Sequence, residues 1–381
     1  LELHGVSAVA GHEETVVATA ISHFASRDSL PVGHVIVKGV DLLDGHLSLS
    51  REDVSVPTRG VGLSFERFYS SASAEPGHMG QGWTHNWLAR VVETPCNELI
   101  LVGTEGSGMR FTPDGGGGWR PPRGHHGTLI VDDVDNEIDF YTTGGIRYHF
   151  VRVTTQDGQP IGQWLLDFVE DPSRNRTSLV YDEGGDGLPR VKRVIGPAGR
   201  ELVFSYEERI FRYWGGDVLT RVDGPDFLEA HFDYDERGNL TEAWREGDAR
   251  HESYGYDTIA FRDVLTSVTN RLNGAATSYE YSSGSLGLVG GAADIFLVRR
   301  LTEAEGGTTQ FFYDTDALAN NADELTTWVR DPREPSTTPP THAAPGSYDT
   351  TYTLNGYGSP TIITDPLGNT TAIEWASNDA V

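Results

Sequence analysis

The chain has very little cysteine and methionine, it is poor in basic residues, and it has no long apolar run. Its single cysteine, Cys96, has no partner for an intrachain disulfide, so packing and strand pairing must hold the fold together. No stretch approaches the roughly 20 apolar residues that a membrane-spanning helix needs. The 29 basic residues against 56 acidic ones give a formal net charge of -27, which repels phosphate backbones and anionic lipid. We therefore expect neither nucleic-acid binding nor a membrane span.

Glycine and aromatic residues, by contrast, are abundant. The 45 glycines and the aromatic content of 10% are typical of many short strands joined by tight turns. Apolar and polar residues alternate in several segments, for example from His46 to Ser50. We predict an all-β fold in which antiparallel β-hairpin repeats form a long curved sheet.

The first residues differ from this pattern. Apolar residues recur at helical spacing between residues 13 and 25, and Pro31 follows them. The spacing predicts a short N-terminal helix, which either packs on the wall of its own protein or serves as a plug or docking element. Glu13 and Glu14 argue against a secretory signal in this stretch. Because there is no initiating Met and the last residues lie inside a repeat, we expect a fragment or a processed piece.

A degenerate Tyr-Asp repeat organises the second half of the chain. Each copy is interpreted as a strand, a turn and a strand, in which Pro and Gly reverse the chain and the aromatic residue packs on a neighbouring strand. We predict three regions: a helical segment over residues 1–38, a β-rich region over 39–170 and the repeat sheet over 171–381. The residues expected to define the repeat are Tyr181, Asp182, Tyr206, Tyr234, Asp235, Gly238, Tyr256, Tyr313, Asp365, Pro366 and Gly368.

The β-rich region contains a more specific motif. It begins with Pro-Thr-Arg-Gly at residues 57–60 and continues through residues 67–71 to Gly-Gln-Gly-Trp at 80–83. Together with the Tyr-Asp pairs, this run resembles the RHS and YD-repeat family, which includes bacterial polymorphic toxins, the shell-forming subunits of Tc toxins, and teneurins. The motif residues singled out by the resemblance are Arg67, Tyr69, Gly80, Gly82 and Trp83.

The resemblance carries expectations about function. In that family the repeats form a β-sheet strip that spirals into a hollow shell around a toxic C-terminal segment. The resemblance implies that this chain is a non-catalytic structural segment of such a shell or scaffold, which encapsulates or delivers a toxin or other cargo, and so is not an enzyme. It further implies that the chain's partners are the rest of its own polypeptide or a cargo toxin, and that it is secreted or placed on the cell surface by a bacterium.

Two alternatives stay open. The first is a cell-surface module that binds carbohydrate or protein, for which the cluster of Trp83, His85 and Trp87 would offer stacking surfaces, although alternating aromatic residues more often pack one face of a strand. The second is a subunit that self-associates through exposed strand edges.

Motifs for catalysis, cofactors and metals are absent or fit a structural role better. There is no Gly-x-Ser-x-Gly elbow, and the glycine-rich stretches lack the remaining residues of a phosphate or dinucleotide loop. The acidic run at residues 132–137 lacks the glycine and the distal glutamate of a calcium loop. The turn at Asp365 resembles the self-cleavage motif of the family, but Asn369 stands where an apolar residue is expected, so we interpret it as a repeat turn. We predict no catalytic, cofactor-binding or metal-binding residues.

Overall fold

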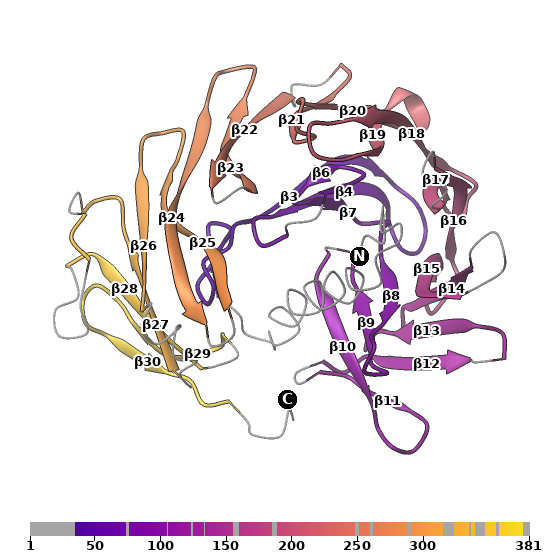
Figure 1. Cartoon of the computed structure of the whole chain (residues 1–381), viewed down its shortest axis with the longest axis horizontal. Helices are drawn as coiled ribbons and strands as arrows, with labels where there is room; N and C mark the ends of the chain where they lie inside the picture. Colours follow the sequence, from indigo (N-terminus) through magenta and orange to yellow (C-terminus); the bar gives the residue numbers. More distant parts are fainter. Residues whose placement is uncertain are drawn as a thin grey trace. The chain divides into compact units, whose positions relative to one another are not determined.

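The structure, a computed structural model, describes residues 35–375 except for 74–75, 105, 123–124, 133, 155–159, 185–188, 248–250, 260–261, 289–290, 315–323, 335–336, 340–346 and 356–357. Within these residues the secondary structure consists of β-strands and one short 3-10 helix, η1 (Pro225–Phe227) (Figure 1). Among the strand pairs whose register is defined in this part of the chain, all are antiparallel and most join consecutive strands. The predicted all-β hairpin fold is confirmed. The predicted helix at residues 13–25 lies outside the described residues.

The described chain divides into two compact units. The first contains Ser50–Tyr69 and Glu75–Arg250, and the second contains Leu30–Leu49, Ser70–Ala74 and His251–Val381. Each unit thus combines repeat strands with part of an earlier stretch, residues 35–89, which we call the leading segment.

The first unit holds the early strands of the sheet. Phe65 of the leading segment packs against Phe204 and Phe232 of the repeats, with ring centroids 5.7 and 5.5 Å away. Its strands are β3 (Ser48–Val56, of which Ser48 and Leu49 are counted with the second unit), β4 (Leu63–Ser70), β5 (Pro76–Gly77), β6 (Gly80–Gln81), β7 (Trp83–His85), β8 (Arg90–Glu93), β9 (Leu99–Val102), β10 (Gly108–Pro113), β11 (Trp119–Arg120), β12 (Thr128–Asp132), β13 (Glu137–Tyr141), β14 (Arg147–Thr154), β15 (Pro160–Glu170), β16 (Arg176–Glu183), β17 (Pro189–Ile195), β18 (Glu201–Ile210), β19 (Gly215–Asp223), β20 (Glu229–Tyr234) and β21 (Leu240–Arg245).

The second unit continues the same pattern. Leu42 and Leu47 of the leading segment are fully buried there, as are Leu265 and Phe311 of the repeats. Its strands are β1 (Ile36–Val37), β2 (Val40–Asp41), β22 (His251–Ile259), β23 (Arg262–Asn270), β24 (Ala276–Leu288), β25 (Gly291–Thr302), β26 (Thr308–Tyr313), β27 (Glu324–Arg330), β28 (Asp349–Asn355), β29 (Pro360–Thr364) and β30 (Thr370–Ala372).

The repeat turns share one pattern of hydrogen bonds. In the Asp365 turn, carboxylate Oδ1 accepts the backbone N–H groups of Leu367 and Asn369, and Oδ2 accepts the side-chain amide of Asn369. The turns that begin at Asp171 and Asp235 repeat the same three bonds. Because an aspartate here replaces the missing backbone partners, it fixes the reversal of the chain. The Asn369 bonds also hold the pKa of the exposed Asp365 below its usual value.

Candidate functional site

The tyrosines of the repeats are joined to the sheet by a recurring hydrogen bond. In four copies the phenolic hydroxyl donates to a backbone carbonyl 15 or 16 residues earlier, at 2.7 to 2.9 Å. Each acceptor lies where the strand register shifts by one residue, which marks a β-bulge. The donor and acceptor pairs are Tyr181 with Leu166, Tyr234 with Leu219, Tyr281 with Leu265, and Tyr313 with Val298.

Tyr313 is buried, and the other three tyrosines are partly buried. Burial is the main cause that raises the pKa of the hydroxyls of Tyr181, Tyr234 and Tyr313 above the ordinary value, so all three stay protonated and able to donate. In these four copies the hydroxyl thus ties its strand to the hairpin before it, a contact between neighbouring repeats.

Tyr206 lacks this hydrogen bond, so it serves as a control for a prediction about Tyr234. Its buried hydroxyl has no hydrogen-bond partner among the described residues, although burial is again the main cause of its raised pKa. Replacing Tyr234 with phenylalanine should lower the free energy of unfolding by about 1 kcal/mol, because the Leu219 carbonyl loses a buried donor. The Tyr206→Phe variant should be neutral or more stable. Urea denaturation of both variants measures the difference, and equal losses would contradict it.

The leading segment binds the same bulges. In the first unit the N–H of Leu219 donates to the carbonyl of His78 at 2.7 Å. In the second unit the N–H of Val298 donates to the carbonyl of Gly45 at 2.9 Å. The carbonyls of Leu219 and Val298 therefore each accept a hydrogen bond from a repeat tyrosine, and their N–H groups each donate one to the leading segment. Through these two equivalent contacts the leading segment joins the repeat strands within each unit. We call the repeat strands together with the leading segment the wall.

Glycine is required where the leading segment approaches a repeat turn most closely. Gly80 has a φ of 81°, and a Cβ added there would lie 2.3 Å from the carbonyl oxygen of Gly238. Gly238 is crowded in turn, since a Cβ on it would lie 2.5 Å from the Trp214 ring. A side chain at Gly80 would separate the two backbones, and one at Gly238 would displace the Trp214 ring.

We expect Gly80→Ala to destabilise the first unit by about 1–3 kcal/mol, because the new methyl group is both strained and overpacked. The control is Gly62→Ala, since Gly62 has open space around its Cβ position. Chemical denaturation reports the change. If the two variants lost the same stability, the close approach at Gly80 would not matter to the fold.

The other motif residues of the leading segment lie in the core of the first unit. The guanidinium of Arg67 makes two hydrogen bonds to the carboxylate of Asp53, at 2.6 and 3.1 Å. It also lies 5.0 Å from the ring of Trp83, against which Tyr69 packs at 5.2 Å. Gly82 precedes Trp83 with a φ of 77°. Trp83 and Trp87 are both buried, which confirms the packing interpretation of this cluster.

The remaining repeat residues are spread along the sheet. Asp182 accepts a hydrogen bond from Arg190 at 2.9 Å, and Tyr256 lies opposite Leu265. Asp365, Pro366 and Gly368 form the turn before β30. The structure does not gather the predicted residues into one pocket. It distributes most of them along the ladder, and the contacts of Gly238 and Tyr313 with the leading segment are local to each unit.

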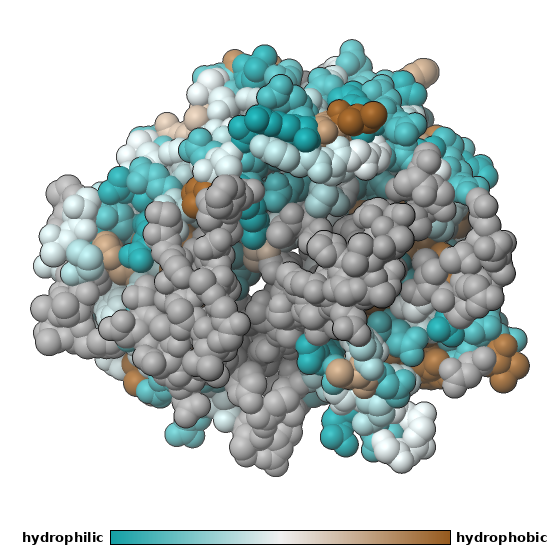
Figure 2. Space-filling view, viewed as in Figure 1, coloured by the Kyte–Doolittle hydropathy of each residue, from teal (hydrophilic) through white to brown (hydrophobic). Residues whose placement is uncertain are grey.

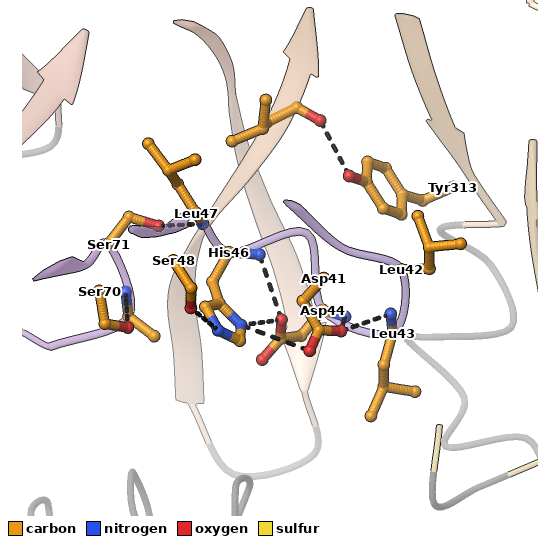
Figure 3. Close-up of polar contacts among 12 residues, drawn as sticks. Asp41, Leu42, Leu43, Asp44, His46, Leu47, Ser48, Ser70, Ser71 and Tyr313 are labelled. Atoms are coloured by element: carbon orange, nitrogen blue, oxygen red, sulfur yellow. Dashed lines mark hydrogen bonds and ion pairs between the residues drawn. The ribbon is translucent and has the colours of Figure 1, made fainter. Parts of the chain in front are cut away.

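A polar cluster in the second unit was not predicted from the sequence (Figure 3). Asp41, Asp44 and His46 place one ligand atom each within 4.8 Å of one another. Nδ1 of His46 lies 2.5 Å from Oδ1 of Asp44, and Nε2 lies 2.9 Å from Oγ of Ser48. Asp41 is buried, and its Oδ1 accepts the N–H of Leu43.

The cluster had a signal in the sequence. Asp44, His46 and Ser48 occupy every second position of the sequence, although Ser48 begins β3 whereas Asp44 lies in the turn before it. We interpreted the alternation from His46 to Ser50 only as evidence for a strand and predicted no metal-binding or catalytic residues. Two carboxylates and an imidazole are a set that can hold a divalent cation. They can equally hold and move a proton.

Residues 38–111 match a family described as a domain of unknown function, DUF6531. The probable deoxyribonuclease RhsB of Dickeya dadantii is 29% identical over 238 residues, which cover 58% of this chain and 14% of that protein. RhsA of the same organism is 26% identical over 275 residues, 66% of this chain and 17% of the relative. The tRNA3(Ser)-specific nuclease WapA of Bacillus spizizenii is 24% identical and matches 52% of this chain and 8% of its own length.

Among solved structures, TcdB2-TccC3-Cdc42 covers 76% of this chain and 18% of its own, with 15% identity and a TM-score of 0.37. The N-terminal domain of SpvB from Salmonella typhimurium covers 60% of this chain and all of its own, with 13% identity and a TM-score of 0.31.

The fold and the repeated tyrosine bonds define a β-repeat wall protein. The relatives in Dickeya dadantii are Rhs proteins, so the predicted resemblance to the RHS and YD-repeat family is confirmed. One prediction is wrong: we had expected no enzyme, whereas the relatives are named as nucleases. The prediction came from motifs within this chain, which spans about a sixth or less of the length of these relatives.

Proposed function

We propose that the chain is a wall segment of a larger RHS polypeptide that encloses a cargo and has nuclease activity as a whole. The observation that carries the proposal is the pair of equivalent contacts at Leu219 and Val298, where repeat and leading segment join through one bulge residue. A wall tied at several bulges resists opening at any single point. The nuclease activity is proposed from the names of the relatives.

The charge of the chain supports a basic cargo. With 56 acidic and 29 basic residues, the wall is strongly negative. A nuclease that binds a phosphate backbone needs cationic side chains. An acidic wall attracts such a domain and repels free nucleic acid. On the face shown in Figure 2, hydrophilic residues cover most of the described surface and hydrophobic ones lie scattered, which suits a solvated exterior.

The proposal includes bacterial origin and export, with the rest of the polypeptide and its cargo as partners. No helix in the described part of the chain is long and apolar enough to cross a membrane. We propose that the division into a helical segment over 1–38, a β-rich region over 39–170 and a repeat sheet over 171–381 holds in the longer polypeptide.

The test uses the full-length polypeptide. Its nuclease activity on DNA and tRNA should be low while the shell is intact and should rise when the wall is opened by Arg67→Met or by acid. Protection of the cargo from protease should fall in parallel. The control is Arg209→Met, because Arg209 pairs with Glu207 on the surface. Full activity of the intact polypeptide, with a cargo open to protease, would contradict enclosure.

A further inference from the structure

The polar cluster of the second unit contains a continuous chain of hydrogen bonds. Asp44 lies in the turn before His46, Ser48 begins β3, and the imidazole lies between the carboxylate and the hydroxyl (Figure 3). The distances are 2.5 Å from Asp44 Oδ1 to Nδ1 and 2.9 Å from Nε2 to Ser48 Oγ. Carboxylate, imidazole and hydroxyl stand in the order that serine nucleophiles require.

The chemistry of the donors sets the direction of the chain. An ionised carboxylate can only accept, so Nδ1 of His46 carries the hydrogen. Nε2 of the neutral ring is then an acceptor, and the Ser48 hydroxyl donates to it. This is the tautomer in which His46 can take the proton of Ser48.

The surroundings favour that proton transfer. Asp41 brings a second carboxylate oxygen to 4.0 Å from Nδ1 of His46. Both side chains are buried, and in such a setting two carboxylates stabilise the imidazolium that forms when the ring accepts a proton.

The backbone holds the chain of side chains in place. Leu47, between His46 and Ser48, donates its N–H to Oγ of Ser71 and accepts from the N–H of Ser71. The N–H of Ser48 donates to the carbonyl of Gly39 at 2.7 Å. Ser48 itself is partly exposed, so a small electrophile can approach its hydroxyl from solvent.

We propose that Ser48 is a nucleophile toward activated acyl esters, with His46 as its general base and Asp44 as the residue that positions the ring. Oγ of Ser48 attacks the ester carbonyl carbon while its proton passes to Nε2 of His46. The carbon–oxygen bond to the leaving alcohol breaks, and the imidazolium returns the proton to that oxygen. Water then hydrolyses the acyl-serine, again with His46 as base, and releases the carboxylic acid.

A divalent cation bound to Asp41, Asp44 and His46 would compete with the hydrogen-bonded chain from Asp44 through His46 to Ser48, which we call the relay. A metal at Nδ1 of His46 needs the lone pair that the hydrogen occupies in the relay, so zinc should inhibit acylation. Acylation that proceeds in EDTA and falls with added zinc supports the relay. Acylation that requires zinc would overturn it.

The experiment treats the chain with 4-nitrophenyl acetate in EDTA and locates acetyl groups by peptide mass spectrometry. Ser50 is the internal control, because it is an exposed serine two residues further along the same strand. Ser48 should be acetylated about 100-fold faster than Ser50, the scale of a positioned general base. The rate at Ser48 is also measured as a function of pH, for comparison with the variants. Equal rates at the two serines would overturn the proposal without any variant.

Variants assign the roles once circular dichroism shows that each is folded. Ser48→Ala should leave only the slow acetylation of Ser50 in this stretch, and Ser50→Ala should leave the rate at Ser48 unchanged. His46→Asn should reduce the rate at Ser48 to that of Ser50. Asp44→Asn should lower the rate and shift its pH dependence, which a residue with only a structural role would not do. A pH dependence unchanged in Asp44→Asn would remove Asp44 from the relay.

Discussion

Replacing Arg67 with methionine is expected to lower the free energy of unfolding of the first unit by about 3–5 kcal/mol. The side chain of Arg67 is 2% exposed and that of its partner Asp53 is 16% exposed. Methionine fills much of the volume but leaves the Asp53 carboxylate without its cation. It also removes the guanidinium from the faces of Trp83 and Phe232, at 5.0 and 5.8 Å. Urea denaturation followed by tryptophan fluorescence measures the loss.

Two further variants separate the causes. Arg209→Met breaks a surface pair, so its effect should stay below about 1 kcal/mol. The double variant Arg67→Met with Asp53→Leu replaces both charges by apolar groups and should recover much of the stability, because no buried charge is left alone. If the double variant were no more stable than Arg67→Met alone, the loss would reflect packing and not the ion pair.

Acid should destabilise the first unit through His85. This side chain is fully buried, and burial, with a smaller contribution from the charge of His78, lowers its pKa from 6.5 to about 3. In the unfolded chain His85 therefore binds a proton below about pH 6.5, whereas in the folded chain it binds one only below about pH 3. The stability present above pH 6.5 is lost as the pH falls through this window, by up to about 4–5 kcal/mol.

The His85→Phe variant isolates this contribution from the many carboxylates that titrate in the same range. Phe65 and Phe204 lie around His85 with ring centroids at 5.3 and 5.6 Å, so phenylalanine suits the site. The His85→Phe substitution removes the 3.3 Å hydrogen bond from the Trp87 N–H to Nδ1 of His85. It removes no bond at Nε2, which has no hydrogen-bond partner among the described residues. From pH 5 to pH 7 the native chain should gain stability relative to His85→Phe, because only the native chain has the His85 contribution. A difference independent of pH would contradict the account.

The strands and turns were predictable because their causes are local. A turn such as the one at Asp365 is defined within five residues, since Asp365 and Asn369 supply its hydrogen bonds themselves. The alternation of apolar residues likewise predicts strands from one short stretch. The bonds that tie the wall together span longer separations, such as 15 residues from Tyr234 to Leu219. Their acceptors are backbone carbonyls, which carry no residue-specific signal.

The site residues show the same limit. The sequence singled out Arg67 as a motif residue, but its burial depends on Asp53, 14 residues away, and on Phe232 in a distant repeat. The alternation of Asp44, His46 and Ser48 was visible. Its meaning depended on the side-chain directions and on Asp41, which the turn through Leu43 brings beside His46.

The measurement that tests the wall most directly is amide hydrogen exchange at Leu219 and Val298. If the leading segment is built into the wall, both amides should exchange as slowly as the centre of the sheet strands, because each donates to a carbonyl of the leading segment. In Gly80→Ala, exchange at Leu219 should accelerate while Val298 stays slow. Rapid exchange of both amides in the native chain, beside slow exchange in the repeats, would show that the leading segment is not part of the wall.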